Sequence, residues 1–163
     1  MKNTIITGVI IVIVLVGLMV WGKNNQTTES IKKSEVSSVL TTSEKIYDFG
    51  TISMKDGLVN YTFKVTNPSD KDIYIKKINT SCMCTQAYIE TADGEKGPFG
   101  MEGMGYIPPV NETIKAGEFR NVKVVYDPNA HGPAGVGMID RFIYLIGADG
   151  ETTQLEIKAV VTP

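Results

Sequence analysis

The two cysteines of the chain are its sharpest chemical feature, because Cys82 and Cys84 flank a single methionine. If this stretch is an extended strand, both thiols point to the same face. Their Cα atoms would then lie about 6.6 Å apart, at the outer limit for a disulfide. A bridge would need a local kink, would be easily reduced, and would close too small a loop to add much stability. A purely structural disulfide is therefore a poor explanation for the pair.

Other soft ligands of the chain lie in two glycine-rich stretches. Met101 and Met104 belong to the first stretch, and His131, the only histidine, belongs to the second. Thiolate and thioether groups favour Cu(I) among the biological metals. We therefore predict a Cu(I) site formed by Cys82, Cys84, Met101, Met104 and His131. Zinc is less natural, because the set has three nitrogen or thiolate ligands and no evident fourth.

Less specific explanations of the same residues stay open. The cysteines could be a redox-active or strained disulfide, or two reduced and half-buried thiols. Methionines in loops often only fill gaps, and a histidine in a glycine-rich loop is often solvated. A thiol–disulfide enzyme ranks last, because nothing basic lies next to the cysteines in the sequence to lower a thiol pKa.

Composition excludes several classes of function. The 163 residues carry 16 Lys and Arg against 18 Asp and Glu, a net charge of −2, so no basic stripe for nucleic acid is expected. One histidine does not support a His-rich zinc enzyme or a Ser-His-Asp hydrolase. No glycine-rich phosphate-binding motif is present. We therefore predict that the protein is not an enzyme.

The first residues, 1–22, read as a membrane anchor. Residues 4–22 contain no charged side chain, and as a helix they would span about 28 Å, close to the thickness of the bilayer hydrocarbon. The competing interpretation is a cleaved secretory signal, but the segment lacks a small-x-small cleavage site. We predict a single-pass cell-membrane protein with its bulk on the extracytoplasmic side. This orientation is the common layout for a lone first segment, since the lysine count does not decide it.

A tether is predicted to follow, over residues 23–44. It is rich in Ser and Thr and lacks aromatic residues, which is typical of a flexible coil that reaches about 25 Å on average.

Residues 45–163 show the period-2 pattern of strands separated by turns. Residues 59–65 and 119–126 alternate apolar and polar side chains, and a parity slip before Ile78 indicates a bulge. About seven strands and no convincing helix predict an all-β, antiparallel, immunoglobulin-like sandwich, with a small barrel as the structural rival. Residues 91–110, rich in Gly, Pro and Met, are predicted to be one long functional or mobile loop.

Several motifs together resemble a bacterial family of small exported domains of unknown function, which is similar to Hydin-type and major-sperm-protein-like immunoglobulin sandwiches. The motifs are YDFGTI at residues 47–52, VTN at 65–67, SCMCT at 81–85, the turn at 114–118 and the strand end at 124–127. The resemblance covers residues 45–163 and implies a sandwich fold, export and a non-enzymatic role.

Two further segments, 97–101 and 127–133, resemble a subset of that family with an elaborated loop. Members of the subset often have His where Met104 stands here. This departure keeps a soft ligand and shifts the expected preference toward copper.

The combined prediction is a membrane-anchored, extracytoplasmic immunoglobulin-like module that binds Cu(I). The alternative is a protein-interaction or scaffolding domain of the cell envelope, with a redox-labile or incidental cysteine pair.

Overall fold

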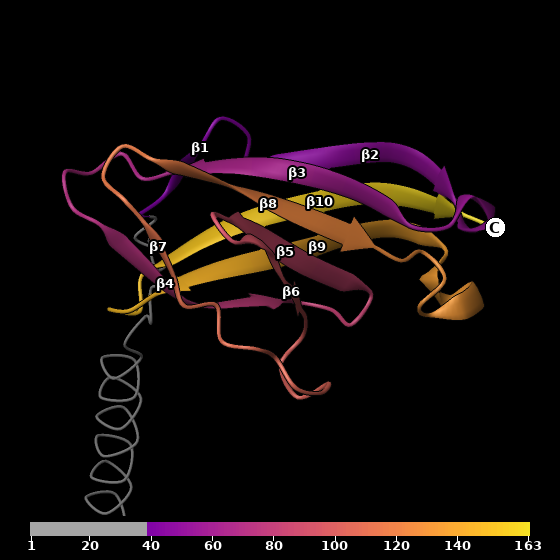
Figure 1. Cartoon of the computed structure of the whole chain (residues 1–163). Helices are drawn as coiled ribbons and strands as arrows, with labels where there is room; N and C mark the ends of the chain where they lie inside the picture. The colour runs from indigo at the N-terminus through magenta and orange to yellow at the C-terminus, as the bar shows by residue number, and fades with distance from the viewer. Residues whose placement is uncertain (1–38) are drawn as a thin grey trace, which may run out of the picture. The chain divides into compact units, whose positions relative to one another are not determined.

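The computed structural model describes residues 39–163, which fold into two five-stranded β-sheets around one hydrophobic core (Figure 1). The first sheet has the order β1-β3-β8-β5-β6, and the second has the order β2-β10-β9-β4-β7. The strands are β1 (Thr41–Thr42), β2 (Ile46–Ser53), β3 (Val59–Thr66), β4 (Ile73–Thr80), β5 (Thr85–Thr91), β6 (Gly94–Phe99), β7 (Glu112–Ile114), β8 (Phe119–Tyr126), β9 (Gly137–Gly147) and β10 (Thr152–Thr162). Two 3-10 turns, η1 (Met54–Asp56) and η2 (Gly132–Gly135), complete the described elements.

The all-β sandwich agrees with the prediction, whereas the strand count and the purely antiparallel pairing need correction. Among the described residues there are ten strands, where about seven were predicted. One pair, β2 with β10, is parallel, and the other pairs are antiparallel. The parallel pair ends with the Ser53 hydroxyl donating to the carbonyl oxygen of Pro163 at 3.0 Å. The residue that follows β10 is therefore held against the end of β2.

Strand β3 shows how the alternating pattern builds the core. Phe63 and Val65 are buried between the sheets, while Lys64 between them is exposed. Burial of such side chains stabilises a fold by about 1.5–3 kcal/mol each, which is why the alternation is a reliable strand signal. The bulge predicted before Ile78 is also confirmed, because the pairing of β4 with β9 shifts register between Ile75 and Lys77.

The sandwich begins before the predicted boundary at residue 45. Leu40 is only 1% exposed and belongs to the core, and β1 pairs with β3. Val39 and Leu40 are two neighbouring apolar residues flanked by Ser and Thr, which give no alternating pattern, so the sequence places them in the predicted tether. Residues 23–38 of the predicted tether and the predicted anchor at 1–22 lie outside the described residues. Within residues 39–163 there is no helix with the length and hydropathy that a membrane crossing needs.

The prediction of one long loop at 91–110 needs correction, because Thr91 ends β5 and residues 94–99 form strand β6. Thr91 pairs with Gly94, so the chain reverses over two residues and returns along β5. Beyond β6, the backbone amide of Thr80 donates to the carbonyl oxygen of Gly100 at 3.1 Å. Met101 pairs with Thr80 in an isolated bridge. This segment therefore starts from a fixed position beside β4.

Candidate functional site

The cysteines lie in a tight turn between β4 and β5 and not in an extended strand. The amide of Thr85 donates to the carbonyl oxygen of Cys82 at 3.1 Å, which closes the turn. Ser81 is attached to β9, since its amide donates to Phe142 O and its hydroxyl accepts from Phe142 N, each at 2.9 Å. The turn shortens the Cα–Cα distance of Cys82 and Cys84 to 5.3 Å. The pair is thus within disulfide range and is joined as a disulfide.

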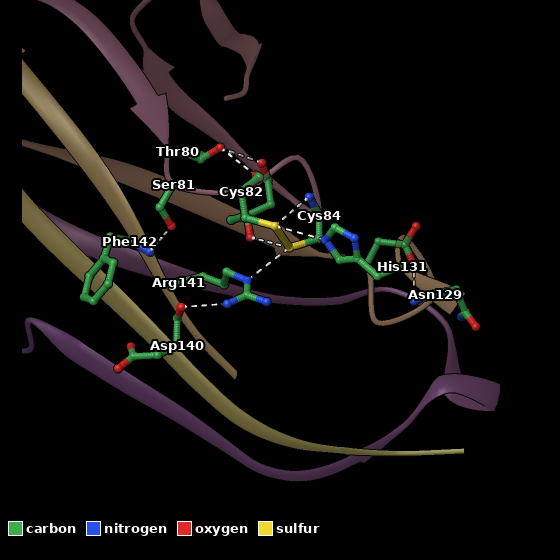
Figure 2. Close-up of a disulfide and its surroundings, with 11 residues drawn as sticks. Thr80, Ser81, Cys82, Cys84, Asn129, His131, Asp140, Arg141 and Phe142 are labelled. Atoms are coloured by element: carbon green, nitrogen blue, oxygen red, sulfur yellow. Dashed lines mark hydrogen bonds between the residues drawn. A yellow bond between two sulfur atoms is a disulfide. The ribbon is translucent and has the colours of Figure 1, made fainter. Parts of the chain in front are cut away.

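His131 reaches the cysteines from the loop between β8 and β9. Its Nε2 atom lies 3.2 Å from Cys82 Sγ (Figure 2). The start of this loop is fixed to the turn, because the amide of Asp127 donates to Cys84 O at 2.9 Å. The side-chain amide of Asn129 then donates to Met54 O at 2.7 Å. The backbone around His131 is therefore secured on both the turn and η1.

Arg141 is a site residue that the sequence analysis missed. Its Nε atom lies 3.2 Å from Cys84 Sγ, and its Nη1 donates to Asp140 O at 2.9 Å (Figure 2). Cys84 is only 2% exposed, so the guanidinium is a permanent cation beside a buried sulfur. The sequence does contain a signal that Arg141 faces the core. Arg141 falls on the same parity as Ile139 and Ile143, and a charge at an inward-facing strand position is uncommon.

The groups around this cation form a mixed electrostatic environment. Burial raises the pKa of Tyr126 above its ordinary value, the positive charge of Arg141 acts against this rise, and Asp127 adds to it. Desolvation raises the pKa of Asp140, and its hydrogen bond with Glu156 raises it further. Of these groups, Arg141 is the one whose side chain contacts a sulfur atom.

We call the group formed by Cys82, Cys84, His131 and Arg141 the thiol site. The ligand atoms of Cys82, Cys84 and His131 all lie within 4.8 Å of one another. As a disulfide, the two sulfurs are bonded to each other and do not act as thiolate ligands. After reduction, the same turn offers two thiolates and an imidazole, a donor set that suits a soft ion such as Cu(I).

The predicted methionine ligands line a pocket beside the cysteine turn. Met101 and Met104 line a pocket of about 230 Å³ together with Met83, and neither the cysteines nor His131 line it. We call it the methionine pocket; its other lining residues are Gln86, Pro98, Gly100, Gly105, Tyr106 and Ile107. Of the five predicted ligands, Cys82, Cys84 and His131 converge within 4.8 Å, and Met101 and Met104 line this pocket. A larger hollow of about 690 Å³, along residues 90–92 and 117–121, contains no cysteine, methionine or histidine and offers no comparable chemistry.

Comparison with known proteins supports the fold and gives no activity. A family described as "Protein of unknown function (DUF1573)" matches residues 40–101, a stretch that includes both cysteines but neither His131 nor Arg141. No curated protein matches the chain.

A protein of unknown function from Porphyromonas gingivalis W83 has a similar structure, with a TM-score of 0.53 and 15% identity over 77% of this chain. The chain spans about half of that protein, namely 48% of its length. The VesB protease of Vibrio cholerae is 14% identical, with a TM-score of 0.48 over 75% of this chain and 32% of its own. The ASH / PapD-like domain of human CEP192 is 11% identical, with a TM-score of 0.45; the similarity covers 78% of this chain and 87% of that one. The similarity to the Porphyromonas gingivalis protein concerns the fold alone, and the family that matches residues 40–101 is described as one of unknown function.

Proposed function

We propose that the domain is a redox-gated binding module for a soft metal ion, Cu(I). The observation that carries the proposal is the convergence of three soft ligand atoms, from Cys82, Cys84 and His131, within 4.8 Å of one another. Thiolates favour Cu(I) over harder ions, and imidazole suits copper as well. Met101 and Met104 are left out of the proposed ligand set, because they line a separate pocket.

The gate is the oxidation state of the cysteine pair. As a disulfide, the pair holds no thiolate and does not bind the ion. After reduction, the sulfurs stay close together, because the turn is attached through Ser81 to β9 and continues at Thr85 into β5. Two thiolates with Cu(I) carry a net charge of −1, which the guanidinium of Arg141 at 3.2 Å from Cys84 Sγ partly offsets.

The proposed location of the domain is the extracytoplasmic side of the cell membrane, with residues 1–22 as the anchor. The proposed role of the domain is binding and not catalysis. The support is the uncharged stretch at 4–22 and an oxidising compartment in which a thiol pair can form a disulfide. A phosphatase that folds only outside the cytoplasm, fused after Pro163, is expected to be active. An inactive but expressed fusion would contradict this location.

The metal proposal is tested by anaerobic Cu(I) titration of the full chain against a chromophoric chelator. The reduced protein should bind one ion with sub-micromolar affinity, and the disulfide form should not. Cys82→Ser should abolish binding and His131→Ala should weaken it about tenfold or more, because each removes a ligand. Met101→Leu is the matched control and should bind like the wild type. Equal binding by the reduced wild type and Cys82→Ser would end the proposal.

A second candidate function is a protein-interaction domain of the cell envelope. The observation that favours it is the exposure of apolar side chains around the methionine pocket, where Met83 is 48% and Met104 is 56% exposed. Flexible thioether side chains adapt to varied partner surfaces. If this candidate holds, changing both cysteines to serine leaves partner binding intact, whereas Met104→Asp abolishes it.

A further inference from the structure

We propose that the Cys82–Cys84 disulfide accepts an electron pair from a dithiol, with Cys82 as the attacked sulfur and Cys84 as the leaving sulfur. The proposal concerns the same cysteines as the metal site, but in their oxidised state, and it requires no metal. It can therefore hold when Cu(I) binding fails, and it can fail when Cu(I) binding holds.

The two sulfurs differ in accessibility. Cys82 is partly exposed, whereas Cys84 is 2% exposed. A thiolate must approach one sulfur along the axis of the S–S bond, so the accessible sulfur is the one that an external thiol attacks. His131, itself exposed, lies against Cys82 with Nε2 at 3.2 Å from Sγ. The approach of a thiol to Cys82 therefore leads past the imidazole of His131.

The environment of Cys84 suits a leaving sulfur. When the S–S bond breaks, this sulfur becomes a buried thiolate, which is unfavourable unless a charge or donor compensates it. Arg141 supplies both, with Nε at 3.2 Å from Cys84 Sγ. The hydroxyl of Thr85, 3.7 Å from the same sulfur, can add a second hydrogen bond. A stabilised thiolate is a better leaving group, so cleavage is faster when Cys84 leaves than when Cys82 does.

The exchange takes place in two steps. One thiolate of the dithiol attacks Cys82 Sγ, the S–S bond breaks, and its electron pair moves to Cys84 Sγ, leaving a mixed disulfide on Cys82. The second thiolate of the dithiol attacks its own bound sulfur, which closes the external disulfide and releases Cys82 as a thiolate. Two electrons pass to the cysteine pair, and the two protons that the dithiol loses are replaced on the cysteines from solvent. The dithiol is oxidised, and Cys82 and Cys84 are reduced.

Trapping with a monothiol tests the direction of attack without any substitution. The oxidised full chain in mild detergent is treated with glutathione, quenched with acid, and mapped by mass spectrometry. We expect at least about ten times more adduct on Cys82 than on Cys84, because an attacking thiol must reach its target sulfur. Equal adducts on the two cysteines, or a majority on Cys84, would overturn the proposal.

Kinetics of reduction test the part of Arg141. Dithiothreitol should reduce the pair at least about tenfold more slowly in Arg141→Met, because the leaving thiolate loses a charge-assisted hydrogen bond. Arg141→Lys should recover most of the rate. Lys158→Met, which removes a cation whose ion pairs are with Glu156 and Asp140, is the control and should react like the wild type.

A reduced Cys-x-x-Cys peptide, used in parallel, separates a polypeptide dithiol from a small one as the source of electrons. Reduction by either probe supports the exchange. A wild-type disulfide that neither probe reduces, or an Arg141→Met variant with the wild-type rate, contradicts it.

Discussion

The thiol site and the methionine pocket share one turn, yet they hold their sulfur atoms differently. In the thiol site, Cys84 is buried and each sulfur has a nitrogen at 3.2 Å. In the methionine pocket, Met83, Met101 and Met104 are 48%, 37% and 56% exposed. The first region is thus organised for a defined reaction at sulfur, whereas the second is an adaptable apolar surface.

The topology of the first sheet explains the separation. Strand β5 begins directly after the cysteine turn and has β8 on one side and β6 on the other. The loop that follows β8 carries His131, and the segment that follows β6 carries Met101 and Met104. Because these segments leave from opposite neighbours of β5, they flank the turn from two sides. Two clusters of soft ligands in a sequence can therefore belong to two surfaces.

The largest expected effect on stability concerns the residue at which β6 ends and the segment that carries Met101 and Met104 begins. Phe99, the last residue of β6, is fully buried, so Phe99→Ala should lower the free energy of unfolding by about 3–5 kcal/mol. Met104→Ala, at the exposed tip, should change it by about 0.5 kcal/mol or less. Urea denaturation measures both. If the two variants lose similar stability, burial of Phe99 does not fix the segment that carries Met101 and Met104.

A smaller effect is expected from opening the disulfide. The Cys82–Cys84 bridge closes a loop of a few residues, so its reduction should lower the free energy of unfolding by about 2 kcal/mol or less. Urea denaturation with and without a reductant gives this difference, and Met83→Leu in the same turn should change nothing. Unfolding of the domain on reduction would show that the thiol site is structural and not reactive.

The smallest effect concerns the turn that presents Met101 and Met104. Glu102 forms an ion pair with Lys77, and its Oε1 accepts from Asn79 Nδ2 at 3.1 Å. Glu102→Gln should cost less than about 1 kcal/mol of stability, because both members of the pair are exposed. It should nevertheless speed hydrogen exchange at the amide of Met104, which donates to Met101 O at 3.3 Å. High salt should mimic the substitution in the wild type, and unchanged exchange would show that Glu102 does not hold the turn.

Most of the framework could be predicted from local patterns. Strands β3 and β8 alternate cleanly, because each buries one face, and the bulge in β4 shows as a slip of parity. Strand β6 could not be recognised in this way, because Gly97 and Pro98 are typical of loops. At the edge of a sheet, however, a proline needs no amide partner, and β6 is an edge strand.

The candidate site could be predicted only in part. The proximity of Cys82 and Cys84 follows from their spacing, although the turn that joins them does not. Their contact with His131 depends on which strands pair, and local sequence does not determine pairing between distant strands. Arg141 is the opposite case, because its inward parity in β9 is readable from the sequence although it lies 57 residues from Cys84.

The hydrogen bond from Ser53 to the last residue has a practical consequence. It places the end of the chain, marked C in Figure 1, beside η1. Met54 of η1 accepts through its carbonyl oxygen from Asn129, two residues before His131. A small environment-sensitive dye attached to the C-terminus would therefore sit at the same end of the sandwich as the disulfide. Its emission could follow oxidation and reduction in real time, without any label on the cysteines themselves.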